Sequence, residues 1–127
     1  MGILIVDDSK HLRLLLENML KRAGYDNIYS AGSANEAYQI LQVDNPSISP
    51  PEIKLIIMDI NMPTEDGIVA CRRIKAEEHL KDIPIIVLTA ITDEKKLKSA
   101  MEAGAVGYLQ KPARKELFLA KIKSIVG

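Results

Sequence analysis

Side chains able to bind a metal ion and to receive a phosphoryl group follow four short apolar segments of this sequence. Asp7 and Asp8 come directly after the first segment, Asp59 after the third, Thr89 after the fourth and Lys111 shortly after the fifth. In an open sheet of parallel strands, the residues that follow the strands gather at one edge, where such sheets bind ligands. We therefore expect three carboxylates, a hydroxyl and an ammonium in one crevice.

The charges of this set indicate what the crevice could bind. Three carboxylates within a few ångströms repel one another unless a cation or a proton compensates them, and Mg²⁺ is a hard cation that prefers such oxygen ligands. The Lys111 ammonium suits a phosphoryl oxygen, and the Thr89 hydroxyl can donate to another. Asp59 is then placed as a nucleophile that forms an acyl phosphate. Taken singly, Asp8 or Ser9 could be only a helix cap; the combination favours a functional site.

The elements that would position these residues alternate along the chain. Continuous runs of Ile, Val and Leu are typical of strands buried on both faces of a parallel sheet. The predicted strands are residues 3–6, 27–31, 53–58, 83–88 and 106–109. The predicted helices are residues 12–23, 33–41 with the cap included, 68–79, 93–103 and 114–126. Alternating β and α units predict an open α/β sheet with helices on both faces, whereas a TIM barrel needs eight such units.

Local signals predict the ends of the first two helices. The apolar stripe of the first helix consists of Leu12, Leu15, Leu16, Met19, Leu20 and Ala23. Gly24 is placed to end this helix, and Leu14 falls outside its stripe. Ser33 and Glu36 have the spacing of a capping box at the start of the second helix.

Composition limits the possible classes of protein. The 127 residues are 47% apolar and 27% charged, which predicts one globular domain over residues 1–127. Seventeen basic residues balance seventeen acidic ones, so no overall field would attract nucleic acid or an anionic membrane. The single cysteine, Cys71, excludes an internal disulfide and fits a reducing compartment. The first apolar run is too short for a signal peptide or a membrane span. We expect a cytoplasmic domain.

The sequence resembles the response-regulator receiver family over essentially its whole length. The matching stretches are IVDDS, IIMDINMPTEDG, IIVLTA and AGAVGYLQKP, at residues 5–9, 56–67, 85–90 and 103–112. The resemblance implies a flavodoxin-like (βα)5 fold, a doubly wound five-stranded parallel sheet with strand order 2-1-3-4-5. It also implies a regulatory domain of two-component signalling, which is no enzyme beyond catalysing its own phosphorylation and slow autodephosphorylation. A free-standing regulator and a piece of a longer regulator or hybrid kinase both remain open.

The resemblance also implies roles for individual residues. It assigns four Mg²⁺ ligands: the carboxylates of Asp7, Asp8 and Asp59 and the backbone carbonyl of Asn61. Asp59 would accept the phosphoryl group from a phosphohistidine of a sensor histidine kinase or a histidine phosphotransfer protein. Thr89 and Lys111 would contact that group, and Tyr108 stands where the family has its rotating switch aromatic. An output domain or effector protein is expected on the face formed by the fourth helix, fifth strand and fifth helix.

Residues near this site have secondary roles in the same interpretation. Family members dock their phosphodonor on the first helix, which makes Leu12 and Leu15 better contact candidates than Leu14. His11 is expected to be a surface residue rather than a catalytic one. Ile91 is apolar where an attacking water would approach, which predicts slow loss of the phosphoryl group.

Two other classes of protein compete with this interpretation. A haloacid-dehalogenase-like phosphatase also uses an Asp nucleophile with Mg²⁺, but its nucleophile follows the first strand in a DxD arrangement. Here the first strand ends in adjacent Asp7 and Asp8, and Asn61 replaces the usual acid/base carboxylate after Asp59. A flavodoxin-like FMN carrier needs a phosphate-binding loop after the first strand, where this acidic sequence would repel a phosphate in the absence of a metal.

Overall fold

The protein is an alternating arrangement of parallel strands and helices. We analysed a computed structural model, which describes residues 2–45, 47–62, 67–90, 94–111 and 114–127. Its strands are β1 (Gly2–Val6), β2 (Asn27–Ala31), β3 (Ile53–Asp59), β4 (Ile85–Thr89) and β5 (Gly107–Gln110). Its helices are α1 (Lys10–Arg22), α2 (Ala34–Leu41), α3 (Gly67–Ala76), α4 (Glu94–Glu102) and α5 (Lys115–Val126).

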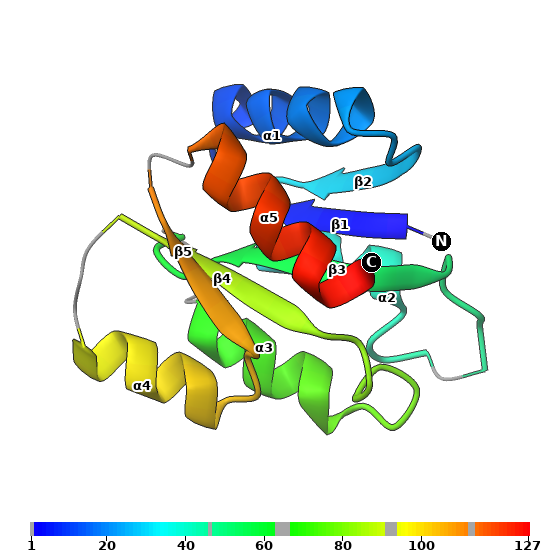
Figure 1. Cartoon of the computed structure of the whole chain (residues 1–127). Helices are drawn as coiled ribbons and strands as arrows, with labels where there is room; N and C mark the ends of the chain where they lie inside the picture. The colour runs from blue at the N-terminus through cyan, green and yellow to red at the C-terminus, as the bar shows by residue number, and fades with distance from the viewer. Residues whose placement is uncertain (1, 46, 63–66, 91–93, 112–113) are drawn as a thin grey trace.

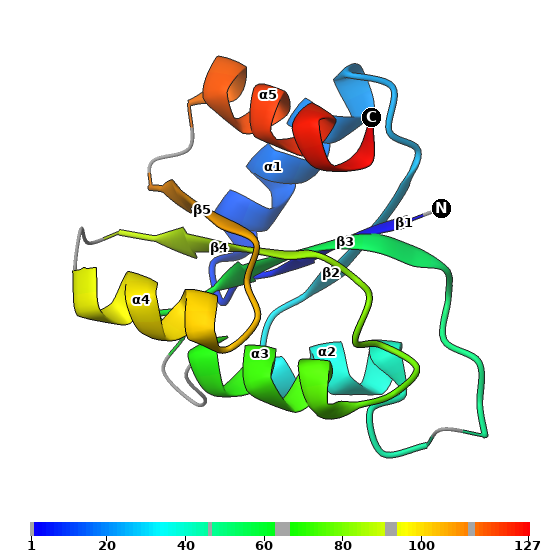
Figure 2. The same ribbon diagram turned by 60° about the horizontal axis from the view of Figure 1, so that its bottom comes forward.

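One parallel sheet lies at the centre of the molecule, with helices on both of its faces. Its strand order is β2-β1-β3-β4-β5, which confirms the predicted order. Figures 1 and 2 show α1 and α5 on one face and α2, α3 and α4 on the other. This is the doubly wound, flavodoxin-like α/β fold expected from the sequence.

Burial explains which segments form the inner strands. Every residue of β1 and β4 is buried, and β3 is buried except at Lys54, as continuous apolar runs between two helical layers require. Alternate residues serve the two layers: Ile3 and Ile5 pack with α1 and α5, whereas Leu4 and Val6 pack with the core on the opposite face. The edge strand β2 is mostly exposed or half-buried. The inner strands therefore form a rigid base for the residues at their carboxyl ends.

The predicted helix caps are present, with one shift. The Ser9 side chain accepts a hydrogen bond from the backbone N–H of Leu12 at 3.2 Å, so α1 begins at Lys10, two residues before the prediction. Gly24 adopts a φ of +98° directly after that helix, as a C-terminal cap requires. The Ser33 side chain accepts from the backbone N–H of Glu36 at 3.1 Å. The Glu36 carboxylate reaches back to the N–H of Gly32, one residue earlier than in a regular capping box.

The predicted apolar stripe of α1 is wrong at two positions. Leu16 and Leu20 are fully buried, whereas Leu15 is 41% exposed and Ala23 is exposed. Leu15 lies at the margin of the stripe, and Ala23 is the C-cap residue, beyond the last turn that packs on the sheet. Leu14 is exposed, as predicted.

The third helix ends earlier than the sequence suggested. It stops at Ala76, three residues before His79, because the chain then continues in turns. Lys75 stabilises these turns by donating to the carbonyls of Lys81 at 2.9 Å and Ile83 at 2.5 Å. Strand β4 begins after Pro84 rather than at residue 83, because proline has no N–H for a sheet hydrogen bond.

Among the helices of the described residues, none combines the length and the apolar composition needed to cross a membrane.

Candidate functional site

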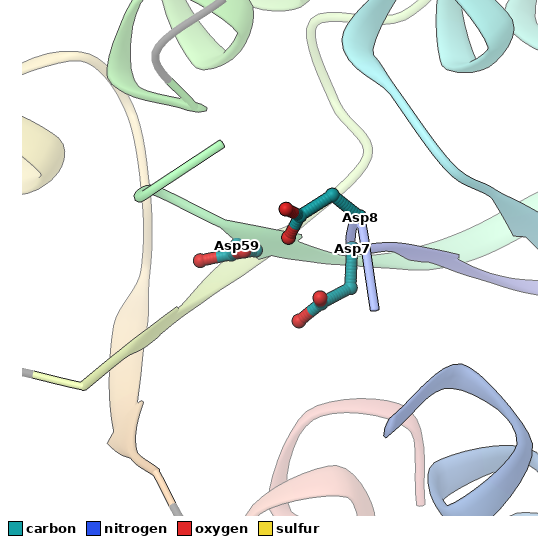
Figure 3. Close-up of side chains that lie close together, drawn as sticks. All are labelled: Asp7, Asp8 and Asp59. Carbon is teal, nitrogen blue, oxygen red and sulfur yellow. The ribbon is translucent and has the colours of Figure 1, made fainter. Parts of the chain in front are cut away.

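Three carboxylates gather at the carboxyl ends of β1 and β3. Asp7 and Asp8 follow β1, and Asp59 is the last residue of β3. One oxygen of each residue lies within 4.8 Å of the others, and Figure 3 shows the three side chains side by side. Asp7 and Asp59 are buried, whereas Asp8 is exposed. The structure thus brings together the three acidic residues that the sequence singled out.

Lys111 lies between the two buried carboxylates. Its Nζ is 2.9 Å from Asp7 Oδ2 and 3.3 Å from Asp59 Oδ2. Both contacts are ion pairs. The other carboxylate oxygens accept backbone N–H groups, Asp7 Oδ1 from Ser9 at 2.8 Å and Asp59 Oδ1 from Asn61 at 2.9 Å. These bonds fix the orientation of both carboxylates.

The pKa values of Asp59 and Lys111 are both raised, but for different reasons. Burial raises the pKa of Asp59 and the Asp7 charge adds to the rise, against the Asn61 N–H and the Lys111 charge, which lower it. Burial alone would lower the pKa of Lys111, but its contacts with Asp7 and Asp59 outweigh burial and raise that pKa. The surroundings of the pair therefore favour the charged form of Lys111 and disfavour the charged form of Asp59.

This donor set fits a hard divalent cation. One ammonium offsets one of three carboxylates, which leaves about two negative charges at a site formed entirely by oxygen atoms. Mg²⁺ prefers one or two carboxylates, carbonyls and water, and the exposed Asp8 leaves the cluster open to solvent. The chemistry and placement of Asp7, Asp8 and Asp59 thus fit a magnesium ion.

The hydroxyl predicted for this site lies on the neighbouring strand. Thr89 is the last residue of β4 and is 2% exposed. Asp59 pairs with Leu88 across the two strands, so Thr89 lies one residue beyond Asp59 along the same edge. Its carbonyl accepts the backbone N–H of Lys111 at 2.7 Å, which joins the ends of β4 and β5. Tyr108 lies further back on β5 and is 50% exposed.

Three residues at the site were missed from the sequence. Gly67 begins α3 so close to β3 that a Cβ there would lie 2.7 Å from Ile60 Cα. Arg13 Nη1 donates to the carbonyl of Asp7 at 2.7 Å, and Lys96 Nζ donates to Asn61 Oδ1 at 3.2 Å. The glycine opening a predicted helix after an acidic strand end was a usable signal for Gly67. The two cations lie on helices, where sequence spacing does not indicate their contacts.

The structure also gives the exposure of other residues considered in the sequence. His11 is exposed, as expected, and Cys71 is fully buried. Leu12 is half-buried, and Leu15 is exposed on α1. Ile91 lies outside the residues that the structure describes. A separate hollow of about 320 Å³ lies at the amino-terminal ends of β1, β2 and β3, where it is lined by Gly2, Asn27 and Lys54. None of the clustered carboxylates lines it.

Comparison with known proteins identifies the family. The sequence matches the response regulator receiver domain over residues 3–123. The chain belongs to the response-regulator receiver family. Receivers are phosphoryl-accepting domains of two-component signalling, and this receiver has that function. The match favours neither the phosphatase nor the flavin carrier.

Individual relatives agree with this assignment. This receiver is 30% identical to the chemotaxis protein CheY homolog of Campylobacter jejuni, over 100% of this chain and 93% of that protein. It is 38% identical to the transcriptional regulatory protein GltR of Pseudomonas aeruginosa, over 98% of this chain but only 48% of that protein. The solved structure of Vibrio cholerae CheY4 has a TM-score of 0.87 and 29% identity, and the match covers 98% of both chains. Receivers of this kind thus occur in relatives of similar length and in longer ones.

Proposed function

We propose that Asp59 is the phosphoacceptor of this receiver, that residues 1–127 form one receiver domain, and that Mg²⁺ is its cofactor. The carboxylates of Asp7, Asp8 and Asp59 and the backbone carbonyl of Asn61 would hold the ion. The observation that carries the proposal is the cluster itself, with carboxylate oxygens within 4.8 Å of one another and Lys111 in contact with two of them.

The charges around Asp59 account for the transfer chemistry. The donor is a phosphohistidine of a sensor histidine kinase or a histidine phosphotransfer protein. The P–N bond of the donor breaks as an Asp59 oxygen forms the new P–O bond, and the donor imidazole recovers a proton. The transferring group is loosely bonded and spreads its charge over three oxygens, so positioning and positive charge supply most of the catalysis. Bound Mg²⁺ would neutralise part of that charge.

The residues around Asp59 divide the remaining work. Lys111 already lies 3.3 Å from Asp59 Oδ2 and supplies a fixed positive charge to a phosphoryl oxygen. The Thr89 hydroxyl donates to a second oxygen. Hydrolysis of the acyl phosphate by the domain itself is slow, because no carboxylate at Asn61 is available as a general base.

Output depends on a change of conformation at β4 and β5, next to the carboxylate cluster. Thr89 moves toward the phosphoryl oxygens, and Tyr108 turns inward into the space that becomes available, a local event that shifts a two-state surface. The surface consists of α4, β5 and α5. Its exposed large apolar side chains are Met101, Tyr108 and Leu117, and the exposed Val106 directly precedes β5. An output domain or effector protein binds there, in the cytoplasm, without direct contact of this domain with nucleic acid or membrane.

Incubation with acetyl phosphate and Mg²⁺ tests this function. A receiver gains one acid-stable, alkali-labile phosphoryl group per chain, and the Asp59→Asn variant gains none. A phosphatase would instead release phosphate through many turnovers, and a flavin carrier would do neither. Labelling that is unaffected by the loss of Asp59 would contradict the proposal.

A further inference from the structure

A lysine of α4 contacts the residue two positions after Asp59. Lys96 Nζ donates to Asn61 Oδ1 at 3.2 Å in a partly buried contact that spans 35 positions of the sequence. Asn61 in turn donates its backbone N–H to Asp59 Oδ1 at 2.9 Å. A single residue therefore links α4 to the clustered carboxylates.

The chemistry of lysine determines how the Asn61 carboxamide is oriented. An ammonium can only donate hydrogen bonds, so the oxygen of the carboxamide must face Lys96 and the NH₂ group must face away. That nitrogen, Nδ2, is buried and has no hydrogen-bond partner among the residues that the structure describes. A buried donor without an acceptor is costly and calls for an explanation.

A phosphoryl group on Asp59 would supply the missing acceptor. Its oxygens are strong acceptors, and a charge-assisted hydrogen bond to one of them is stronger than a neutral one. Mg²⁺ could not satisfy this amide, because a cation accepts no hydrogen bond. The unpartnered donor thus matches the phosphoryl group and not the metal.

We propose that Lys96 is a positioning residue that holds the Asn61 carboxamide so that its buried N–H donates to an oxygen of the phosphoryl group. This inference rests on the proposed role of Asp59. Asn61 then acts through both its main chain and its side chain. Because Lys96 belongs to α4, the contact also gives the phosphoryl group a link to the output surface that is separate from Thr89.

Binding of beryllium trifluoride, which mimics a phosphoryl group on a carboxylate, tests the proposal. Each protein is titrated with beryllium trifluoride at saturating Mg²⁺, and the bound fluorides are followed by ¹⁹F NMR. Lys96→Met removes the ammonium and keeps the apolar stem, and it should weaken binding about five-fold, the size of one hydrogen bond. Lys98→Met removes the same charge from an exposed position of the same helix and should bind as the wild type does. Lys96→Leu, which also removes the donor, serves as a second variant if Lys96→Met folds poorly.

A double-mutant cycle separates positioning from a direct charge effect. In the Asn61→Ala background, Lys96→Met should cause no further loss of affinity. An equal loss in both backgrounds would mean that Lys96 acts on the phosphoryl group by its own charge, and wild-type affinity in Lys96→Met would show no role; either result overturns the inference and leaves the proposed function intact. Failure of the wild-type protein to bind beryllium trifluoride at Asp59 would overturn the proposed function, and this inference with it.

Discussion

Replacing Asp59 with asparagine removes one charge from the carboxylate cluster and preserves its shape. Each neighbouring carboxylate has an oxygen within 4.8 Å, a distance at which like charges repel by about 3.5 kcal/mol at an effective dielectric constant near 20. Lys111 Nζ is 3.3 Å from Asp59 Oδ2 and attracts it by about 5 kcal/mol on the same scale. Solvent screens the repulsion between Asp59 and the exposed Asp8, and the burial of Asp59 adds a desolvation cost. We expect Asp59→Asn to raise the free energy of unfolding by about 1–2 kcal/mol at neutral pH.

The pH dependence of this effect has a defined sign. Burial, helped by the Asp7 charge, raises the pKa of Asp59 in the folded protein above the ordinary value of 3.8. A carboxyl group with a raised folded pKa contributes stability that is present below its unfolded pKa and is lost as the pH rises through the folded pKa. The advantage of the asparagine variant should therefore be fully present above the raised folded pKa and disappear as the pH falls below about 3.8.

Thermal denaturation followed by circular dichroism measures this difference. The expected rise in melting temperature at neutral pH without Mg²⁺ is about 3–10 °C for a domain of this size. Saturating Mg²⁺ should stabilise the wild type by mass action and the variant much less. Asp26→Asn, which removes a charge from an exposed position, is the control and should change little. A melting temperature at or below that of the wild type for Asp59→Asn would refute the argument that the cluster is electrostatically strained.

Three further changes test other parts of the account. Gly67→Ala would place a Cβ 2.7 Å from a backbone atom of the β3 end and should lower the free energy of unfolding by about 1–3 kcal/mol in denaturant titrations. Gly32→Ala meets mainly a flexible arginine side chain and should cost less; equal losses would contradict the close-packing argument. Lys111→Met should slow phosphorylation by acetyl phosphate roughly 10²–10³-fold, and an unchanged rate in a labelling time course would exclude the role of Lys111. Tyr108→Ala should leave phosphorylation intact and weaken output binding in calorimetry once a partner is in hand, whereas unchanged partner affinity would disprove the switch.

The fold could be predicted well because its inner strands carry an unambiguous pattern. The apolar runs of β1, β3 and β4 are buried on both faces, and a parallel sheet between helical layers buries such runs. The strand order could not be predicted in this way, because the alternation of strands and helices does not specify it. The family resemblance supplied it. The end of α3 was missed because no glycine or proline marks a stop before His79, while the hydrogen bonds of Lys75 favour turns.

The functional site also has residues that could be predicted from the sequence and residues that could not. Asp7, Asp8, Asp59 and Lys111 could be brought together from the sequence, because the carboxyl ends of parallel strands share one edge. Lys96 could not be placed there, because its contact with Asn61 joins residues 35 positions apart and depends on how α4 packs. Long-range contacts between helices and loops follow from tertiary structure and leave no periodic signal in the sequence.

Mapping the phosphoryl group to a residue is the most direct test of the central claim. The protein is incubated with acetyl phosphate and Mg²⁺, the acyl phosphate is reduced with borohydride, and the modified residue is located by peptide mass spectrometry. We predict that Asp59 alone is converted and that chelating Mg²⁺ before the incubation abolishes the modification. Modification of Asp7 or Asp8, or labelling that does not require the metal, would contradict the account.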